Sequence, residues 1–321
     1  MPNIWPVQSE LRTYGYQKDK FNPSARYHLV RVAALPSHSP NNAALAPIVK
    51  NQDGVGACGG FAWAEYFYCL ALSIGQPVDA YSENWLYNLA RWMEGTLSQD
   101  AGLSNDDLLT MVAKFGLLIE QYWPWINQLD TAAPSSARQL QAIKYPNFQY
   151  FRVDGGVDGI RSAMAAGLPV VTGGPWFREW ENITSTGLLP MPTLQSDVAG
   201  GHDTLWLDYD DPTRQFYCQN SWGPSFGTGG RFYVPYDAVP IMAQMGGYDV
   251  HYATMDKVPV PIPVPPIPAP IPNPIPTPSP TPVPTPSGCK WGKAVASTMN
   301  LAFMQQLRGR QGRFYYMNPN S

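Results

Sequence analysis

The chain divides into a first half with the helical spacing of apolar residues and a second half with the shorter period of strands. Two helical segments stop at glycines, and one of them begins at the capping residue Ser82 and ends at Gly95. The predicted helices cover residues 60–74, 82–95, 105–116 and 159–167, and the predicted strands cover residues 170–172, 204–209, 215–219 and 231–234. Helices that precede strands in this way predict the α+β class.

Composition marks the ends of the globular part. Residues 257–288 alternate proline with small or apolar residues, and because proline has no N–H they predict a polyproline II rod on the order of 90 Å long. Residues 289–321 are basic, with one amphipathic helix expected over 293–307. We therefore expect an N-terminal arm over 1–45, a domain over 46–256, the proline-rich linker, and a tail that docks on a larger assembly such as a viral particle.

Charge and hydropathy exclude several classes of protein. The net charge is −3, so no basic surface predicts nucleic-acid binding. No run of about 18 apolar residues predicts a membrane span. Residues 1–16 lack the apolar run of a secretory signal, which predicts a chain that stays in the cytoplasm unless lysis releases it. The sequence predicts neither a metal ion nor another cofactor.

Four cysteines are present, and the pattern favours reduced thiols. Cys58 and Cys69 are both predicted on one helix, too far apart along it to be bridged. A disulfide that involves Cys218 or Cys289 stays open.

The first candidate for chemistry is Cys58, which follows a glycine-rich turn and opens a predicted helix. The N-terminus of a helix carries partial positive charge and unpaired N–H groups, which favour a thiolate and can hold an oxyanion. Gln52, six residues earlier, can supply a second donor from its side-chain amide. Taken alone, the segment is equally typical of a small buried cysteine.

Two later segments supply the partners that a nucleophilic cysteine needs. His202 begins a strand after Gly200 and Gly201, which leave room for a substrate backbone. Asn220 ends a strand, and its oxygen can accept the Nδ1–H of His202, which would leave Nε2 facing the thiol. Trp222 is expected to cover that contact and exclude water, although a core tryptophan at a strand end gives the same pattern.

Other aromatic and histidine residues receive simpler interpretations. Trp176, with Phe177 and Trp180 nearby, is a candidate wall of a substrate cleft, which predicts a preference for apolar side chains beside the cleaved bond. The remaining histidines, among them His251, are interpreted as structural.

In chain order, Gln52, Cys58, His202 and the Asn-Ser-Trp-Gly segment at 220–223 resemble the signature of the papain-like cysteine peptidases. The histidine follows the cysteine by 144 residues (202 − 58), inside the window of about 130–150 residues typical of that family. The resemblance covers about residues 35–253. It implies a two-lobed fold, with a helical lobe over about 46–145 and an antiparallel β-barrel-like lobe over about 146–256.

The chain departs from the family pattern at three points. Gly59 and Gly60 follow the nucleophile where relatives carry tryptophan and alanine, which costs about 1 kcal/mol each in helix propensity and predicts a more open cleft floor. Val55 stands where a disulfide cysteine is usual in the family. No long inhibitory propeptide fits before the matched segments, so control of activity is expected elsewhere or not at all.

The resemblance implies a peptidase that acts on a peptide or protein substrate. A resting ion pair of Cys58 thiolate and His202 imidazolium would attack the peptide carbonyl, Gln52 would hold the oxyanion, and Asn220 would orient the base. Two alternatives stay open. One is a peptide-binding module in which the double glycine has impaired the nucleophile, and the other is a thiol acyltransferase with the same triad.

Overall fold

The structure is a computed structural model that describes residues 12–20, 22, 25–28, 34–76, 78–153, 156–183 and 185–258. These all belong to a compact unit over residues 1–267, and a second unit covers residues 268–321. The predicted rod and tail lie outside the described residues, apart from Lys257 and Val258. Within the described part of the chain, no helix is long and apolar enough to cross a membrane.

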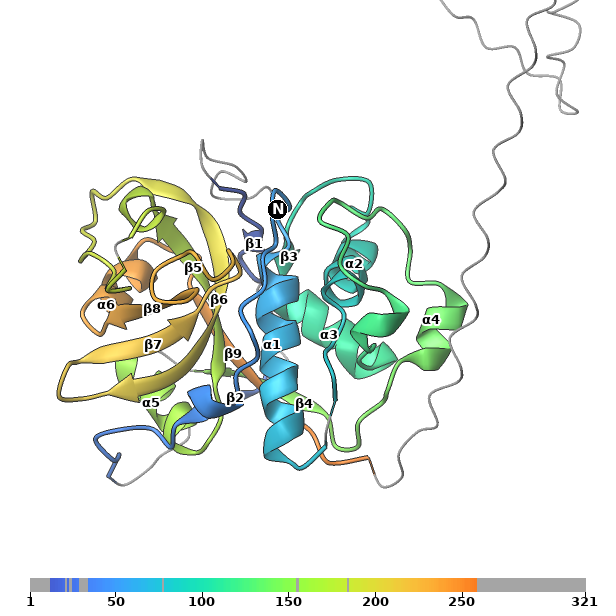
Figure 1. The fold of residues 1–321 in the computed structure, drawn as a ribbon, viewed down its shortest axis with the longest axis horizontal. Helices are drawn as coiled ribbons and strands as arrows, with labels where there is room; N and C mark the ends of the chain where they lie inside the picture. The colour runs from blue at the N-terminus through green and yellow to red at the C-terminus, as the bar shows by residue number, and fades with distance from the viewer. Residues whose placement is uncertain are drawn as a thin grey trace, which may run out of the picture. The chain divides into compact units, whose positions relative to one another are not determined.

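A central helix, α1 (Cys58–Ser73), lies between a helical lobe and a sheet (Figure 1). The helical lobe contains α2 (Glu83–Glu94), α3 (Asn105–Phe115) and α4 (Ser136–Gln141), with the short 3-10 helix η2 (Glu120–Tyr122). Serines cap the three α-helices of this lobe: Ser82 accepts the N–H of Trp85, as the sequence predicts, and Ser104 and Ser135 accept those of Asp107 and Arg138. Gly95 ends α2 in the left-handed region, at φ 74°.

The second lobe is a seven-stranded sheet in the order β2-β4-β9-β5-β6-β7-β8. Its strands are β2 (Tyr27–His28), β4 (Gln149–Val153), β5 (Val170–Phe177), β6 (Val198–Asp210), β7 (Gln215–Gln219), β8 (Arg231–Pro235) and β9 (Asp249–Thr254). All neighbours are antiparallel except β2 and β4. Helices α5 (Val157–Ala165) and α6 (Ala238–Gln244) and the 3-10 helices η1 (Asn42–Leu45) and η3 (Arg178–Trp180) complete this half.

The α+β class is confirmed, but the expected barrel is not. Within the described residues β2 and β8 are the two ends of the sheet and do not pair, so the sheet stays open. The predicted helices and strands agree with α1, α2, α3, α5, β5, β6, β7 and β8, whose ends differ by a few residues. Strand β9 was not predicted, and it joins β4 to β5 in the middle of the sheet.

Gly59 and Gly60 serve close packing rather than an open cleft floor. A Cβ on Gly59 would lie 2.6 Å from Leu103 Cδ1 and 2.9 Å from Asp203 Oδ2, and a Cβ on Gly60 would lie 3.0 Å from the Glu83 carbonyl oxygen. Both glycines are buried in the first turn of α1. The two glycines lower the helix propensity of α1, and in return they allow α2, Leu103 and Asp203 to pack closely against it.

Residues 12–20, which we call the cleft arm, cross the molecule between the two lobes. Within the arm, β1 (Tyr16–Gln17) pairs in parallel with β3 (Leu103–Ser104) of the helical lobe. Figure 1 shows this segment beside the start of α1. The arm therefore lies over the end of the helix that carries Cys58.

Candidate active site

Cys58 is the first residue of α1, as the sequence predicts, and its side chain is fully buried. The Asp203 N–H lies 3.4 Å from the Cys58 sulfur, and the N–H groups of Gly15 and Gly59 also donate to it. Burial raises the pKa of the thiol well above its usual range in spite of these donors. With the cleft arm in place, the cysteine is therefore held as a neutral thiol.

His202 and Asn220 come together, but through the nitrogen that the sequence interpretation assigned to the thiol. His202 Nε2 lies 2.8 Å from Asn220 Oδ1, and Nδ1 has no hydrogen-bond partner among the described residues. The expected pairing of Nδ1 with asparagine is thus wrong for this structure. Because Asn220 Oδ1 also accepts the Ser221 N–H at 2.8 Å, it requires a hydrogen on Nε2 and leaves the lone pair on Nδ1.

The imidazole of His202 lies inside an aromatic cluster. Trp222 stacks on it at 4.6 Å between ring centroids, and Trp176 meets it edge-on at 4.9 Å. Burial lowers the pKa of His202 to about 4, so the ring is neutral at neutral pH. Both tryptophans therefore contact the histidine and shield it from water, while the expected substrate-wall role of Trp176 stays a prediction.

Gly200 and Gly201 lie in β6 directly before the histidine and are buried. They pair with Trp176 and Pro175 of β5. Their position next to His202 agrees with the sequence interpretation, and the space for a substrate backbone stays a prediction.

The Gln52 side chain already holds a carbonyl oxygen. Its Nε2 donates to the Val55 carbonyl at 2.8 Å and to the Thr13 carbonyl of the cleft arm at 3.2 Å. The Ser221 hydroxyl donates to Gln52 Oε1 at 2.6 Å and thereby fixes which end of the amide faces the arm. The Gln52 amide therefore donates to a carbonyl group of the arm in this structure, and its part in holding an oxyanion stays a prediction.

The cleft arm passes Cys58 with almost no spare room. A Cβ on Gly15 would lie 1.7 Å from the Gly56 carbonyl oxygen, and a Cβ on Gly102 would lie 2.1 Å from the Gly15 carbonyl oxygen. The Gly15 carbonyl accepts the Leu103 N–H at 2.7 Å, while its own N–H donates to the sulfur. The thiol therefore faces a donor rather than a carbonyl carbon, and the arm is bound in a way that does not offer Gly15 for attack.

The structure places the short cleft arm against Cys58, whereas no propeptide was expected before the matched segments. The family resemblance did not point to the arm, because the arm is short and matches no propeptide pattern. A signal was present in Gly15, since a glycine between Tyr14 and Tyr16 allows close backbone contact on both sides.

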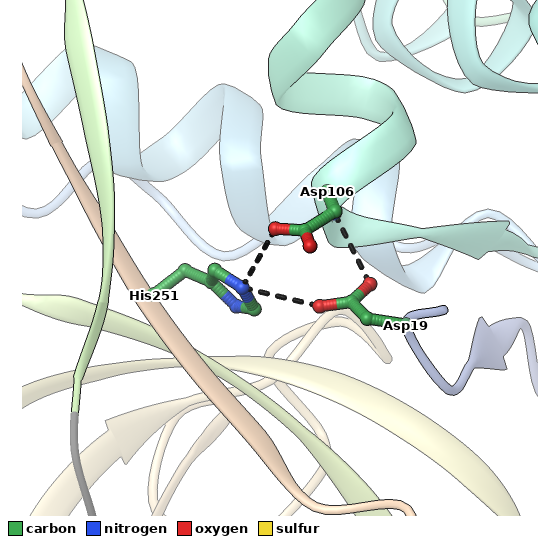
Figure 2. A group of neighbouring side chains, drawn as sticks. All are labelled: Asp19, Asp106 and His251. Carbon is green, nitrogen blue, oxygen red and sulfur yellow. Dashed lines mark hydrogen bonds and ion pairs between the residues drawn. The ribbon is translucent and has the colours of Figure 1, made fainter. Parts of the chain in front are cut away.

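The far end of the arm is anchored by a buried group of charges, which we call the Asp19 cluster (Figure 2). The Asp19 carboxylate accepts the Ser104 hydroxyl at 2.7 Å and the Asp106 N–H at 3.1 Å, and it pairs with Arg152 at 2.7 Å and His251 Nε2 at 3.1 Å. These partners come from both lobes. The sequence interpretation missed the cluster because His251, read as structural, lies far from Asp19 along the chain.

Asp19, Asp106 and His251 are close enough to share a metal ion, with ligand atoms within 4.8 Å of one another. Two cations already balance the carboxylates. Arg152 is one, and His251 is the other: burial lowers its pKa, but Asp19 and Asp106 outweigh burial and raise it to about 9. A protonated imidazole has no lone pair for a metal. The cluster thus fits an ion-pair anchor better than a metal site.

The three described cysteines are free thiols, in agreement with the sequence interpretation. Cys58, Cys69 and Cys218 are buried and unbridged, so the bridge through Cys218 that had stayed open is not formed in this structure. Cys289 lies outside the described residues.

The two-lobed fold is that of the papain-like cysteine peptidases, and the chain is similar to several of them. Xylellain, a cysteine protease from Xylella fastidiosa, matches with a TM-score of 0.68 and 25% identity over 79% of this chain and 100% of its own. A Carica candamarcensis cysteine protease, solved in complex with E-64, matches with a TM-score of 0.51 and 20% identity over 70% of this chain and 100% of its own.

In sequence, the chain is 24% identical over 168 residues to an uncharacterised peptidase C1-like protein of Acanthamoeba polyphaga mimivirus. The match covers 49% of this chain and 54% of the viral protein, so it spans about half the length of that relative. No protein-family model matches the chain.

Replacing Gly15 with alanine is expected to expose the thiol. The new Cβ would overlap the Gly56 carbonyl oxygen, and relief of that overlap moves the arm away from Cys58. We expect a maleimide to react with Cys58 about tenfold faster, from an overlap of 1–3 kcal/mol. Gly54→Ala is the matched control, since a Cβ there has nothing within 4 Å. Equal rates in all three proteins would show that Gly15 does not hold the arm in place.

Proposed function

We propose that the chain is a cysteine endopeptidase that works through Cys58, His202 and Asn220, with Gln52 as an oxyanion donor. One observation carries the proposal. The His202–Asn220 hydrogen bond of 2.8 Å lies beside Asp203, whose N–H is 3.4 Å from the Cys58 sulfur. Nucleophilic catalysis by a thiol requires an oriented base beside a cysteine, and this arrangement supports such a pair.

In the proposed reaction, His202 Nδ1 takes the proton of the Cys58 thiol and the sulfur attacks the peptide carbonyl carbon. The carbonyl oxygen gains the electron pair and is held by Gln52 Nε2 and the Cys58 N–H. His202 returns its proton to the leaving amine, which leaves a thioester on Cys58. A water then attacks the thioester, aided by His202, and releases the acid and the thiol.

The charged pair of thiolate and imidazolium belongs to the open cleft. While the arm covers the site, burial disfavours both charges, because the thiol pKa is raised and the His202 pKa is lowered to about 4. Entry of water and substrate removes part of this penalty. The proposed enzyme is therefore inactive in the covered form and becomes reactive when residues 12–20 leave the cleft.

The second candidate is a peptide-binding module, with the cleft as the binding surface. The arm itself favours it, since Gly15 and Tyr16 lie in the cleft as a bound strand without being positioned for attack. The site residues of a peptidase are nevertheless all present, and the binding module does not need them. The proline-rich linker and basic tail stay a proposal for attachment to a larger assembly.

Covalent labelling separates the two functions. E-64, which is bound in the Carica candamarcensis structure, is an epoxide that captures an activated thiolate, and peptide mapping by mass spectrometry identifies the modified residue. We expect labelling at Cys58 in the parent chain, faster labelling in Gly15→Ala, and loss of labelling in His202→Ala. Equal labelling of Cys58, Cys69 and Cys218, or labelling that survives His202→Ala, would reject the peptidase.

A further inference from the structure

Three residues in register form a row across the middle of the sheet, beside the nucleophile. Gly173 of β5 pairs with Asp203 of β6 on one side and with Asp249 of β9 on the other. Residues in register on neighbouring strands point to the same face. The row thus presents two carboxyl groups with a gap between them where glycine has no side chain, and we call this the acidic slot.

The Tyr16 side chain of the arm occupies the acidic slot. A Cβ on Gly173 would lie 2.3 Å from two atoms of the Tyr16 ring, so only glycine leaves room for it. The Tyr16 hydroxyl donates to Asp249 Oδ2, and the side chain is 3% exposed. The slot therefore fits a flat ring that carries a hydrogen-bond donor at its far end.

The slot begins at the reacting atom. Asp203 Oδ2 lies 3.8 Å from the Cys58 sulfur, and the residue before Tyr16, Gly15, donates its N–H to that sulfur. A peptide that passes Cys58 along the arm's path consequently places a neighbouring side chain in the slot. We propose that the acidic slot is the pocket that selects a tyrosine side chain of the substrate, with its ring over Gly173 and its hydroxyl on Asp249.

Tyrosine fits this pocket better than phenylalanine or a cation. When the arm leaves, Asp249 Oδ2 loses two donors, the Tyr16 hydroxyl and the Asp19 N–H at 3.2 Å, and phenylalanine supplies neither. A lysine or arginine would meet Arg152, which already lies 3.3 Å from Asp249 Oδ1. Burial raises the pKa of Asp203 to about 8, so that carboxyl is mostly protonated at neutral pH. It therefore offers no negative charge to a lysine or arginine of the substrate.

The inference rests on the proposed peptidase function and refines the apolar preference that the sequence predicts. Its test uses the full chain and a peptide library that varies the residues on both sides of the cleaved bond, with cleavage sites identified by mass spectrometry. At one position we expect kcat/KM for tyrosine to exceed that for phenylalanine by about tenfold, and that for arginine by more. A preference for leucine or arginine there would overturn the proposal.

Two variants connect the preference to the slot. Gly173→Ala puts a methyl group where the ring lies, and we expect it to remove the preference for both aromatic residues. Gly174→Ala is the matched control on the other face of β5, where the nearest atom to a Cβ is Tyr248 Cδ2 at 3.0 Å. Asp249→Leu removes the oxygen that accepts the hydroxyl and should bring the tyrosine-to-phenylalanine ratio close to one. An unchanged preference for tyrosine in both Gly173→Ala and Asp249→Leu would reject the slot as the pocket.

A second measurement needs no substrate. Tyr16→Phe removes only the hydroxyl that Asp249 accepts, so the arm should leave the cleft more readily and maleimide should react with Cys58 about tenfold faster. An unchanged rate counts against the slot. The two proposals can fail separately. If E-64 labels Cys58 equally well in His202→Ala, the peptidase is rejected. If the labelling depends on His202 but tyrosine is not preferred, only the slot is rejected.

Discussion

Replacing Gln52 with glutamate is expected to lower kcat about 10²–10³-fold, the usual loss when one oxyanion donor is removed. Glutamate keeps the length of the side chain and an oxygen for the Ser221 hydroxyl, but it replaces the Nε2 donor with a second oxygen. That oxygen would face the developing negative charge. Steady-state kinetics on a peptide cut by the parent chain measure the loss, which should appear in kcat more than in KM.

The matched control for Gln52 is Ser221→Ala. It removes the hydroxyl that orients the Gln52 amide at 2.6 Å and leaves the donor in place, so a smaller loss is expected. E-64 labelling of Cys58 in each variant shows that the thiol is still activated. If Gln52→Glu keeps the parental kcat, the amide has no part in holding the oxyanion.

Raising the pH from 6.5 to 9 is expected to remove about 3 kcal/mol of folding stability through His251 alone. Burial lowers the pKa of this histidine, but the Asp19 and Asp106 carboxylates outweigh burial and raise it to about 9. A histidine with a pKa raised by folding contributes its full stability below its unfolded pKa of about 6.5. That contribution is lost as the pH rises through 9, because the imidazolium then loses its proton.

Other ionisable groups face His251, so its contribution must be measured as the difference in pH dependence between the parent chain and a variant without the histidine. Arg152 of β4, Asp249 of β9 and Asp203 of β6 all act on the cluster, and Asp203 titrates in the same range with a pKa of about 8. Urea unfolding of the parent chain and of His251→Gln at pH 6.5 and 9 isolates the histidine.

The matched control is His38→Gln, whose exposed ion pair with Asp210 should change little. Equal pH dependence in the parent chain and His251→Gln would show that His251 is not held as a cation.

At acidic pH, Asp19 changes the folding stability in the opposite direction, because its contribution is lost as the pH falls. Burial raises its pKa, but His251, Ser104 and the Asp106 N–H outweigh burial and hold it well below the usual range. An acid with a lowered pKa stabilises the fold above its unfolded pKa and loses that contribution as the pH falls further. The arm anchor is therefore strongest between these limits, from about pH 4 to pH 6.5.

The sequence predicted what depends on local spacing. The spacing of apolar residues predicted α1, α2 and α3, and Ser82 was predicted as a helix cap. Each of these predictions depends on residues within a few positions of one another. The order of Cys58, His202 and Asn220 also indicated the family, since that signature consists of short segments. The same segments said nothing about which histidine nitrogen meets Asn220, because ring orientation is set by three-dimensional packing against Trp222 and Trp176.

The sequence could not predict what depends on contacts between distant segments. The row of Asp203, Gly173 and Asp249 exists only because β5 lies between β6 and β9. The anchor joins Asp19 to His251, 232 positions apart (251 − 19). The predicted barrel came from the family resemblance, and the open strand order corrects it.

Through the Asp19 cluster, the arm connects the two lobes in addition to covering Cys58. Ser104 and Asp106 belong to the helical lobe, while Arg152 and His251 belong to the sheet, and one carboxylate binds all four. The arm is therefore a strut between the two lobes. Cleft width is set partly by this strut, so the opening that a substrate meets after the arm departs need not be the opening that the arm leaves behind.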